Sequence, residues 1–163
     1  MRLLAFTFSL FLLVGCTGQP TSNSNSSSDT ADSDPYFGKA RVVVDFSNDT
    51  DPQVFCVEFP GDDVSGILLL QETGLKLVEA PGGLVCRIEQ TGCEQTVCLG
   101  CACPTFGDPD CRFWSYWHWE DNQWRFSQQG AGDYLVSPGA IEAWKWGNDQ
   151  MPPTWKPDGS ECR

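Results

Sequence analysis

Eight cysteines between residues 56 and 162 constrain this chain more than any other feature of its sequence. Six of them lie between positions 86 and 111, in a stretch rich in glycine, proline and aspartate with few large apolar residues. Because such a stretch has little core of its own, we expect cross-links to hold it. An even number of cysteines in an exported domain predicts disulfides, although the sequence does not fix their pairing. The disulfide candidates are Cys56, Cys86, Cys93, Cys98, Cys101, Cys103, Cys111 and Cys162.

A metal site is the alternative interpretation of the segment CLGCAC at 98–103. Its C-x2-C-x-C spacing supplies thiolates that zinc or an iron–sulfur cluster could use, and a redox-active dithiol is a third interpretation. The spacing is not a paired C-x2-C set, and an oxidising compartment converts such thiols to disulfides. We therefore predict disulfides here, no metal and no resident cofactor.

The N-terminus predicts export and a lipid anchor. Arg2 precedes the apolar run LLAFTFSLFLLV, which suits a signal peptide and is too short to span a bilayer comfortably. The run leads into LVGC, the pattern of the bacterial lipoprotein signal, in which Cys16 is lipidated and becomes the first residue. The alternative is an ordinary secretory signal followed by an unrelated cysteine. We expect a signal peptide at 1–15, a lipidated Cys16 that begins a disordered tether at 16–35, and an extracytoplasmic location in the bacterial cell envelope.

The remaining residues, 36–163, have globular composition and the length of one domain. The chain carries a formal net charge of −12, and its few basic residues form no cluster. A domain this acidic repels nucleic acid, so we predict no nucleic-acid partner. The expected partners are the membrane, through the N-terminal lipid, and either a small-molecule ligand or an envelope protein.

Alternating and β-branched segments predict strands, and one short apolar segment predicts a helix at 64–73. Asp63 or Ser65 can cap the start of this helix, and Gly74 can end it. We expect its ILLL run to be buried against a sheet. The arrangement predicts an α+β domain in which one helix packs on a mixed β-sheet, with a disulfide-rich loop. The predicted strands are 39–47, 52–59, 75–80, 84–90, 112–120, 123–128 and 141–146.

The order of these segments and several short motifs resemble the transcobalamin-like C-terminal domains found in bacterial lipoproteins and exported proteins. The resemblance covers most of residues 40–150. It rests on Thr73-Gly74-Leu75, Gly83-Leu84-Val85-Cys86, Gly92-Cys93, Cys98, Cys101, Cys103, Trp114-Ser115-Tyr116-Trp117, Trp124, Gly130-Ala131, Trp144 and Trp146-Gly147.

This resemblance implies a small, β-grasp-like α+β fold for residues 36–163. In the animal vitamin carriers of the family, the domain closes over one side of cobalamin. The present chain is too short for the large helical domain with which those carriers grip the vitamin, and it has an additional cysteine-rich insert. The resemblance therefore implies the fold and leaves a corrinoid as one candidate ligand.

The aromatic stretch RFWSYWHWE is the candidate ligand surface. Side chains alternate along a strand, so Trp114, Tyr116 and His118 share one face, while Trp117 and Trp119 share the other. We predict that the helix covers one face and that the other, lacking a second layer, leaves aromatic rings exposed. In the alternative, the cysteine loop and the proline-rich tail cover that face and the rings belong to the core. Because stacked rings offer large contact areas, the predicted ligand-binding residues are Trp114, Tyr116, Trp117 and Trp119.

The only histidine of the chain, His118, could be a metal or corrinoid ligand or a general base. The sequence shows no second ligand at a matching spacing, so we interpret it as structural. Glu120 and Asp121 are adjacent carboxylates in a turn, where backbone preferences explain them. We predict no catalytic residue and no enzymatic activity. The predicted function is a cell-surface module that binds a small molecule or cofactor, in the service of a transporter; the alternative is a protein-interaction or structural module with an aromatic docking surface.

Overall fold

The computed structural model describes residues 37–94, 98, 103, 108, 110–148, 151–159 and 162. Most of the regular structure in this part of the chain is β-strand, and it includes one short helix, α1. The elements are β1 (Phe37–Asp45), β2 (Gln53–Pro60), β3 (Val64–Ser65), α1 (Gly66–Gln71), β4 (Leu77–Ala80), β5 (Leu84–Ile88), β6 (Thr91–Gly92), β7 (Phe113–Glu120), β8 (Gln123–Phe126), β9 (Leu135–Val136) and β10 (Ile141–Gly147).

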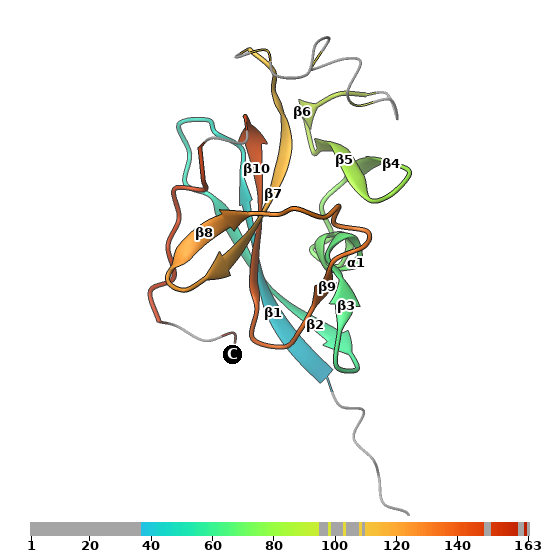
Figure 1. The fold of residues 1–163 in the computed structure, drawn as a ribbon, viewed down its shortest axis with the longest axis vertical. Coiled ribbons are helices and arrows are strands. Elements are labelled where there is room, and N and C mark those ends of the chain that lie inside the picture. Colours follow the sequence, from blue (N-terminus) through green and yellow to red (C-terminus); the bar gives the residue numbers. More distant parts are fainter. Residues whose placement is uncertain are drawn as a thin grey trace, which may run out of the picture. The chain divides into compact units, whose positions relative to one another are not determined.

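The centre of the fold is a five-stranded mixed sheet in the order β2-β1-β10-β7-β8 (Figure 1). Two hairpins, β1–β2 and β7–β8, form its two halves. The last strand, β10, lies between them, parallel to β1 and antiparallel to β7. The predicted mixed sheet is therefore present, and the helix and several strands of the α+β prediction are found where the sequence indicated them.

Every predicted strand is found with boundaries that shift by about two residues or fewer, which is the usual precision of strand ends. The prediction missed three strands, β3, β6 and β9, each of which has two residues. A strand of two residues shows no alternation that a sequence pattern could reveal.

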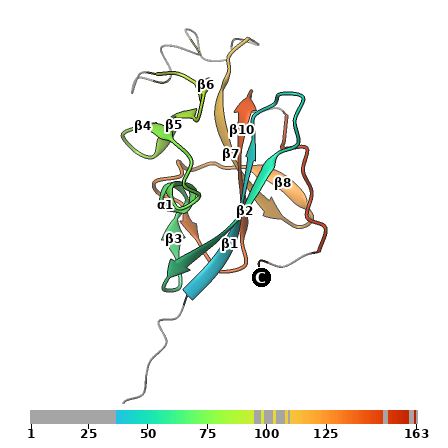
Figure 2. The ribbon, with the colours of Figure 1, turned by 180° about the vertical axis from the view of Figure 1, so that it is seen from behind.

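Helix α1 packs on one face of the sheet, as Figures 1 and 2 show from opposite sides. The Ser65 side chain caps it by accepting a hydrogen bond from the Leu68 N–H at 3.4 Å. Ile67, Leu69 and Leu70 are buried, but 51% of Leu68 is exposed. The expectation that the whole ILLL run is buried was therefore wrong, because consecutive helical residues turn by about 100° and one of four must face away from the sheet.

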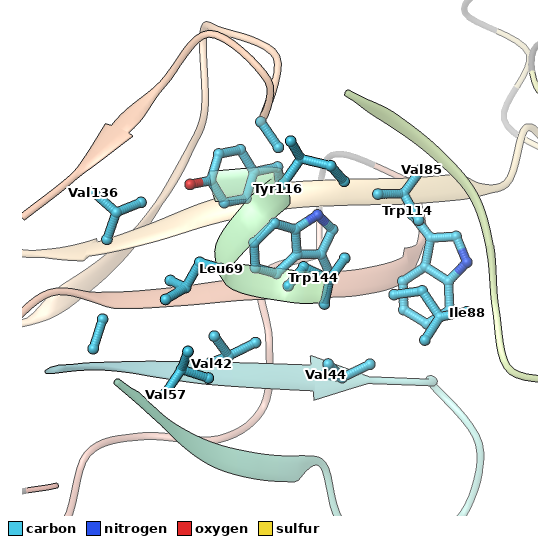
Figure 3. Close-up of a cluster of buried hydrophobic side chains, with 14 of the residues drawn as sticks. Val42, Val44, Val57, Leu69, Val85, Ile88, Trp114, Tyr116, Val136 and Trp144 are labelled. Atoms are coloured by element: carbon cyan, nitrogen blue, oxygen red, sulfur yellow. The ribbon is translucent and has the colours of Figure 1, made fainter. Parts of the chain in front are cut away.

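The main core lies between this face of the sheet and α1 (Figure 3). A small antiparallel sheet, β4-β5-β6, adds Val85 and Ile88 to it. The Trp114 indole on β7 donates a hydrogen bond to the Thr91 carbonyl at 3.1 Å, which joins the small sheet to the central one. The sheet β3-β9 contributes Val136.

Disulfides link three pairs of cysteines, and Cys93 is also disulfide-bonded. The prediction of disulfides is confirmed for these seven residues, while Cys101 and the predicted lipid site Cys16 lie outside the described residues. Such bonds persist in oxidising compartments, which indicates an extracytoplasmic location. Among the described residues, no helix has the length and apolar character needed to cross a membrane. The pairs are Cys56–Cys162, Cys86–Cys98 and Cys103–Cys111.

The second face of the sheet is covered by the C-terminal strap, residues 151–159, which lies on the opposite side of the sheet from α1 (Figure 1). Thr154 donates its backbone N–H to Asp45 at 3.2 Å, and the Trp124 indole donates to the Trp155 carbonyl at 2.8 Å. Beneath them a second buried cluster contains Val43, Trp117 and Ala143, with Trp124, Phe126, Ile141 and Trp155 packed against it. The expectation that this face lacks a second layer was wrong, because the chain returns across it after β10.

Candidate functional site

The predicted aromatic strand is β7, and its side chains alternate between the two faces as expected. Trp114 and Tyr116 join the core below α1, whereas Trp117 joins the cluster below the strap. Their exposed fractions are only 3%, 7% and 5%. Trp119 is half-buried and meets Trp124 edge to face, with 5.2 Å between ring centroids. Three of the four predicted ligand-binding residues are thus core residues, because both faces of the sheet are covered.

A small cavity of about 150 Å³ remains beside Trp114, Tyr116 and Trp144. The rings of these three residues follow one another along the buried face (Figure 3), and Tyr116 stacks on Trp144 with 4.6 Å between centroids. Residues 82–85 and 129–131, which include three glycines, also line the cavity. Ligand pockets usually have volumes of about 300–1,000 Å³, so this cavity suits a few water molecules better than a metabolite.

A buried polar cluster surrounds His118. The His118 Nδ1 lies 2.6 Å from the Glu142 Oε2, and only 7% and 2% of the two side chains are exposed. The Tyr134 ring stacks on the imidazole with 3.9 Å between centroids, and the Tyr116 ring meets it edge-on at 4.6 Å. Because a carboxylate can only accept, its position assigns a proton to Nδ1 and fixes the orientation of the ring.

The two tyrosines of this cluster are held in their neutral form. Burial, followed by the negative charge of Glu142, raises the pKa of Tyr116 far above its ordinary value. Burial and the carboxylates of Glu142 and Glu120 raise the pKa of Tyr134. The Tyr116 hydroxyl is sealed from solvent and has no hydrogen-bond partner among the described residues. The cluster is therefore a largely enclosed polar environment in which the Glu142 carboxylate acts on both tyrosines.

A larger groove lies where β1 meets the loop before β10 and the end of the strap. Its volume is about 470 Å³, within the range of small-molecule sites. The described residues that line it include two cationic side chains, Lys39 and Arg41, and no carboxylate. The other lining residues are apolar or small: Ala40, Pro138, Gly139, Ala140, Ile141, Pro157, Gly159 and Cys162.

The cations of this groove are already held in place by neighbours. The Lys39 Nζ lies 2.7 Å from the Glu58 Oε1, and both side chains are substantially exposed. Arg41 is buried, with its guanidinium carbon 5.4 Å from the centre of the Trp155 ring. The Cys56–Cys162 disulfide fixes the end of the chain beside this groove. An anionic group that enters it meets Lys39 first, because Lys39 is the more exposed of the two cations.

Neither the protein-family models nor the curated proteins that were compared with this chain gave a match. Function must therefore be argued from the two polar sites themselves.

Sequence reasoning missed the partners of both sites. Glu142 lies 24 positions after His118 in the chain and meets it only because β10 pairs with β7. In the sequence, Lys39 and Arg41 look like ordinary strand residues. The groove over them exists only because the loop before β10 and the strap lie beside β1 in the structure. The alternation of β1 was the one available signal, since it places Lys39 and Arg41 on the same face.

Proposed function

We propose that this protein is a non-catalytic, lipid-anchored module of the bacterial cell envelope that binds a small molecule with an anionic group. The observation that carries the proposal is the groove of about 470 Å³ with two cations on its wall. In a chain of net charge −12, this groove is lined by two cations and by no carboxylate among the described residues, although Glu58 partly offsets the charge of Lys39 from outside the groove. Two cations on the wall favour an anionic ligand over the cationic one that the overall charge would attract.

The groove lies elsewhere on the molecule than the aromatic surface expected from the sequence. The proposed class of function, non-catalytic binding of a small molecule, is the same. Binding on the aromatic strand would require the side chains of Trp114, Tyr116 and Trp117 to move out of the core. In the groove, the apolar residues Ile141 and Pro157 can cover the body of a ligand, while Lys39 orients its charged end.

The proposed kinship with the transcobalamin-like C-terminal domains is supported by topology. The order β2-β1-β10-β7-β8, with α1 after the first hairpin and β10 parallel to β1, is compatible with the β-grasp-like fold that the resemblance implies. A corrinoid remains one candidate ligand on this account, and a transporter one candidate recipient. The lipid on Cys16 would keep the module at the membrane.

The test is calorimetric titration of the purified protein with carboxylates, phosphate esters, oligosaccharides and corrinoids. Ala140→Trp places a large ring in the groove, and we expect it to abolish the binding of any ligand found. Lys39→Gln removes the exposed cation and should weaken an anionic ligand by about tenfold, which corresponds to 1.4 kcal/mol. A ligand whose affinity is unchanged in both variants does not bind in the groove, and that result would overturn the proposal.

A protein-interaction module is the second candidate function, and one observation favours it. Leu68 on α1 and Leu135 on β9 are 51% and 63% exposed, and these two elements are in contact. Exposed leucines on neighbouring elements suit the docking of a partner protein. The double substitution Leu68→Gln and Leu135→Gln should abolish partner capture at the membrane and leave ligand binding in the groove intact, so it separates the two functions.

A further inference from the structure

One long edge of the central sheet is open. β2 is the outer strand on one side of the sheet (Figure 2), and among the described residues it pairs with β1 alone. Its eight residues keep an unbroken register with β1, without the bulge that often protects an edge. The outer strand on the other side, β8, has only four residues, and its Trp124 indole is bonded to the strap. β2 is therefore the edge that is long enough to pair with another strand.

The pairing of β1 shows which backbone groups of β2 face outward. Arg41 donates its backbone N–H to the Ala140 carbonyl at 3.0 Å, so the odd-numbered residues of β1 face β10 and the even-numbered ones face β2. Ala40 of β1 is paired with Val57, so the odd-numbered residues of β2 bond to β1. The residues whose N–H and C=O groups point away from the sheet are therefore Val54, Cys56 and Glu58.

These three residues, the outward residues of β2, are exposed to solvent, and 43% of Val54 is accessible. No described residue outside β2 bonds to their backbone groups. The side chain of Cys56 is tied to Cys162 on the strap face, out of the plane in which an added strand would lie. Three donors and three acceptors thus stand in a row, with about 7 Å between successive outward residues, which is the pattern that an added strand requires.

The charges around β2 indicate which strand fits this edge. Within β2, Glu58 is the only charged residue, and it lies 2.7 Å from the Lys39 ammonium. Both ends of the strand are flanked by exposed carboxylates. A second copy of this chain would bring acidic ends together in either direction, and like charges on paired strands are destabilising. A strand with basic ends has the complementary charges. The flanking carboxylates are Asp49, Asp51, Asp62 and Asp63.

We propose that the outer edge of β2 binds an extended segment of a partner protein as a sixth strand of the sheet, and that this segment has basic residues at both ends. Main-chain hydrogen bonds to the outward residues hold the segment, and the flanking carboxylates select its ends. On the face that packs against α1, Phe55, Val57 and Phe59 continue the apolar core to this edge. The segment therefore carries apolar side chains at alternate positions on that face.

The first experiment measures amide hydrogen exchange in the purified protein by nuclear magnetic resonance. We expect fast exchange at the outward residues and slow exchange at Phe55, Val57 and Phe59, whose N–H groups bond to β1. Slow exchange of the outward residues at every protein concentration would mean that the chain itself covers the edge. Slow exchange that sets in as the protein concentration rises would mean that a second copy occupies it. Either result would overturn the proposal.

The second experiment uses a synthetic peptide in which valine and threonine alternate between two lysines at each end. At low ionic strength it should bind and slow the exchange of the outward residues. A peptide with glutamates in place of the lysines should bind about tenfold more weakly. Absence of protection by the lysine peptide, or equal affinities of the two peptides, would contradict the proposal.

A proline on the edge tests the role of the main chain. Val54→Pro removes an N–H group that points outward and leaves the bonds between β2 and β1 in place, so the sheet should tolerate it. It should weaken binding of the lysine peptide by about tenfold, whereas Val54→Thr, which keeps the donor, should not. Equal affinities in these two variants would show that main-chain pairing does not hold the peptide.

The flanking charges have a matched control at the other side of the sheet. The double variant Asp51→Asn and Asp62→Asn should reduce the preference for the lysine peptide several-fold. Glu120→Gln with Asp121→Asn removes the same charge at the β7–β8 turn and should leave the preference unchanged. Equal effects of the two double variants would mean that only the net charge of the chain attracts the peptide, and would refute selection by the ends of β2.

The edge is separate from the surfaces considered above. None of the described residues that line the groove belongs to β2, so Val54→Pro should leave ligand binding in the groove unchanged. The double substitution Leu68→Gln and Leu135→Gln should likewise leave peptide binding unchanged. Failure of the lysine peptide to bind at β2 is therefore distinguishable from failure of the proposed function.

Discussion

Asp45 shows how a single buried carboxylate holds two parts of this fold together. It accepts hydrogen bonds from the Ser47 backbone at 2.8 Å and from Thr154 in the strap at 3.2 Å, and it lies 3.2 Å from the Lys145 ammonium. Burial by itself would raise its pKa. The hydrogen bonds from Ser47 and Thr154 and the charge of Lys145 more than offset this effect, so the pKa of Asp45 is lowered.

This lowered pKa predicts that the protein loses stability in acid. In the unfolded chain Asp45 takes up a proton near pH 3.9, whereas in the folded chain it stays ionised to a lower pH. Its contribution is therefore complete above about pH 4 and is lost as the pH falls further. Urea denaturation at several pH values between 2 and 7 should show this decline. Asp45→Asn should flatten it and cost about 3–5 kcal/mol at pH 7, because the buried Lys145 ammonium loses its carboxylate partner and keeps only the Ser47 hydroxyl.

Asp49→Asn is the matched control for this prediction. Asp49 is exposed in the turn between β1 and β2, so its replacement should leave both the stability at pH 7 and its acid dependence nearly unchanged. Equal pH profiles for the two variants would mean that the acid sensitivity belongs to other carboxylates.

At the scale of elements, α1 rests on β7 through one close contact. A β-carbon built on Gly66, the first residue of α1, would collide with the Tyr116 hydroxyl and would lie 3.2 Å from the Ala131 carbonyl. Alanine is the better helix former by about 0.5–1 kcal/mol, but overpacking costs about 1–3 kcal/mol. We therefore expect Gly66→Ala to destabilise the protein in chemical denaturation.

The Tyr116 hydroxyl makes this contact testable by a double-mutant cycle. Tyr116→Phe removes the nearer of the two colliding atoms, while the ring carbon at 2.8 Å remains. It also removes a buried hydroxyl without a partner, so by itself it should be neutral or stabilise by about 1 kcal/mol. Combined with Gly66→Ala, it should recover at least about 0.5 kcal/mol beyond the sum of the single changes. Strict additivity would show that the helix moves aside instead of pressing on Tyr116.

Local patterns were sufficient to predict most elements of this fold. The alternation in PQVFCVEF and in IEAWKW marks β2 and β10, and the Ser65 cap marks the start of α1. The sequence also predicted correctly that the β7–β8 hairpin turns at Asp121 and Asn122, both of which have positive φ. Contacts between distant segments carry no such local signal. For this reason, the pairing of His118 with Glu142 and the groove beside Lys39 became visible only in the structure.

At the scale of the whole molecule, the C-terminal strap decides what the aromatic strand can do. Without residues 151–159, Trp117 would lose its cover and the sheet would present the aromatic face that the sequence suggested. The alternative interpretation of the sequence, in which the proline-rich tail covers this face and the rings belong to the core, is the one that the strap bears out. The sequence alone could not decide between the two, because a proline-rich tail has the same extended pattern wherever it lies. The strap turns a candidate stacking surface into a second core and, at its far end, contributes Pro157 and Gly159 to the groove.

The disulfide Cys56–Cys162 is the bond that makes this arrangement durable. It joins β2 to the chain just beyond the strap, across a sequence separation of 106 residues. Loss of a cross-link over a loop of this length costs about 4.8 kcal/mol in the chain-entropy account, against about 2.5 kcal/mol for a loop of eight residues. The Cys103–Cys111 disulfide, with a separation of 8, is therefore the natural comparison.

We accordingly expect the double variant Cys56→Ala and Cys162→Ala to lose about twice as much stability as Cys103→Ala with Cys111→Ala. The first variant should also let the strap detach, so that Trp155 and Trp124 become accessible to acrylamide quenching and the groove loses its outer wall. Ligand binding in the groove should weaken in the first variant and persist in the second. If both variants lose equal stability and neither exposes tryptophan, then the contacts of Asp45 and Trp124 hold the strap by themselves, and the disulfide only protects the end of the chain.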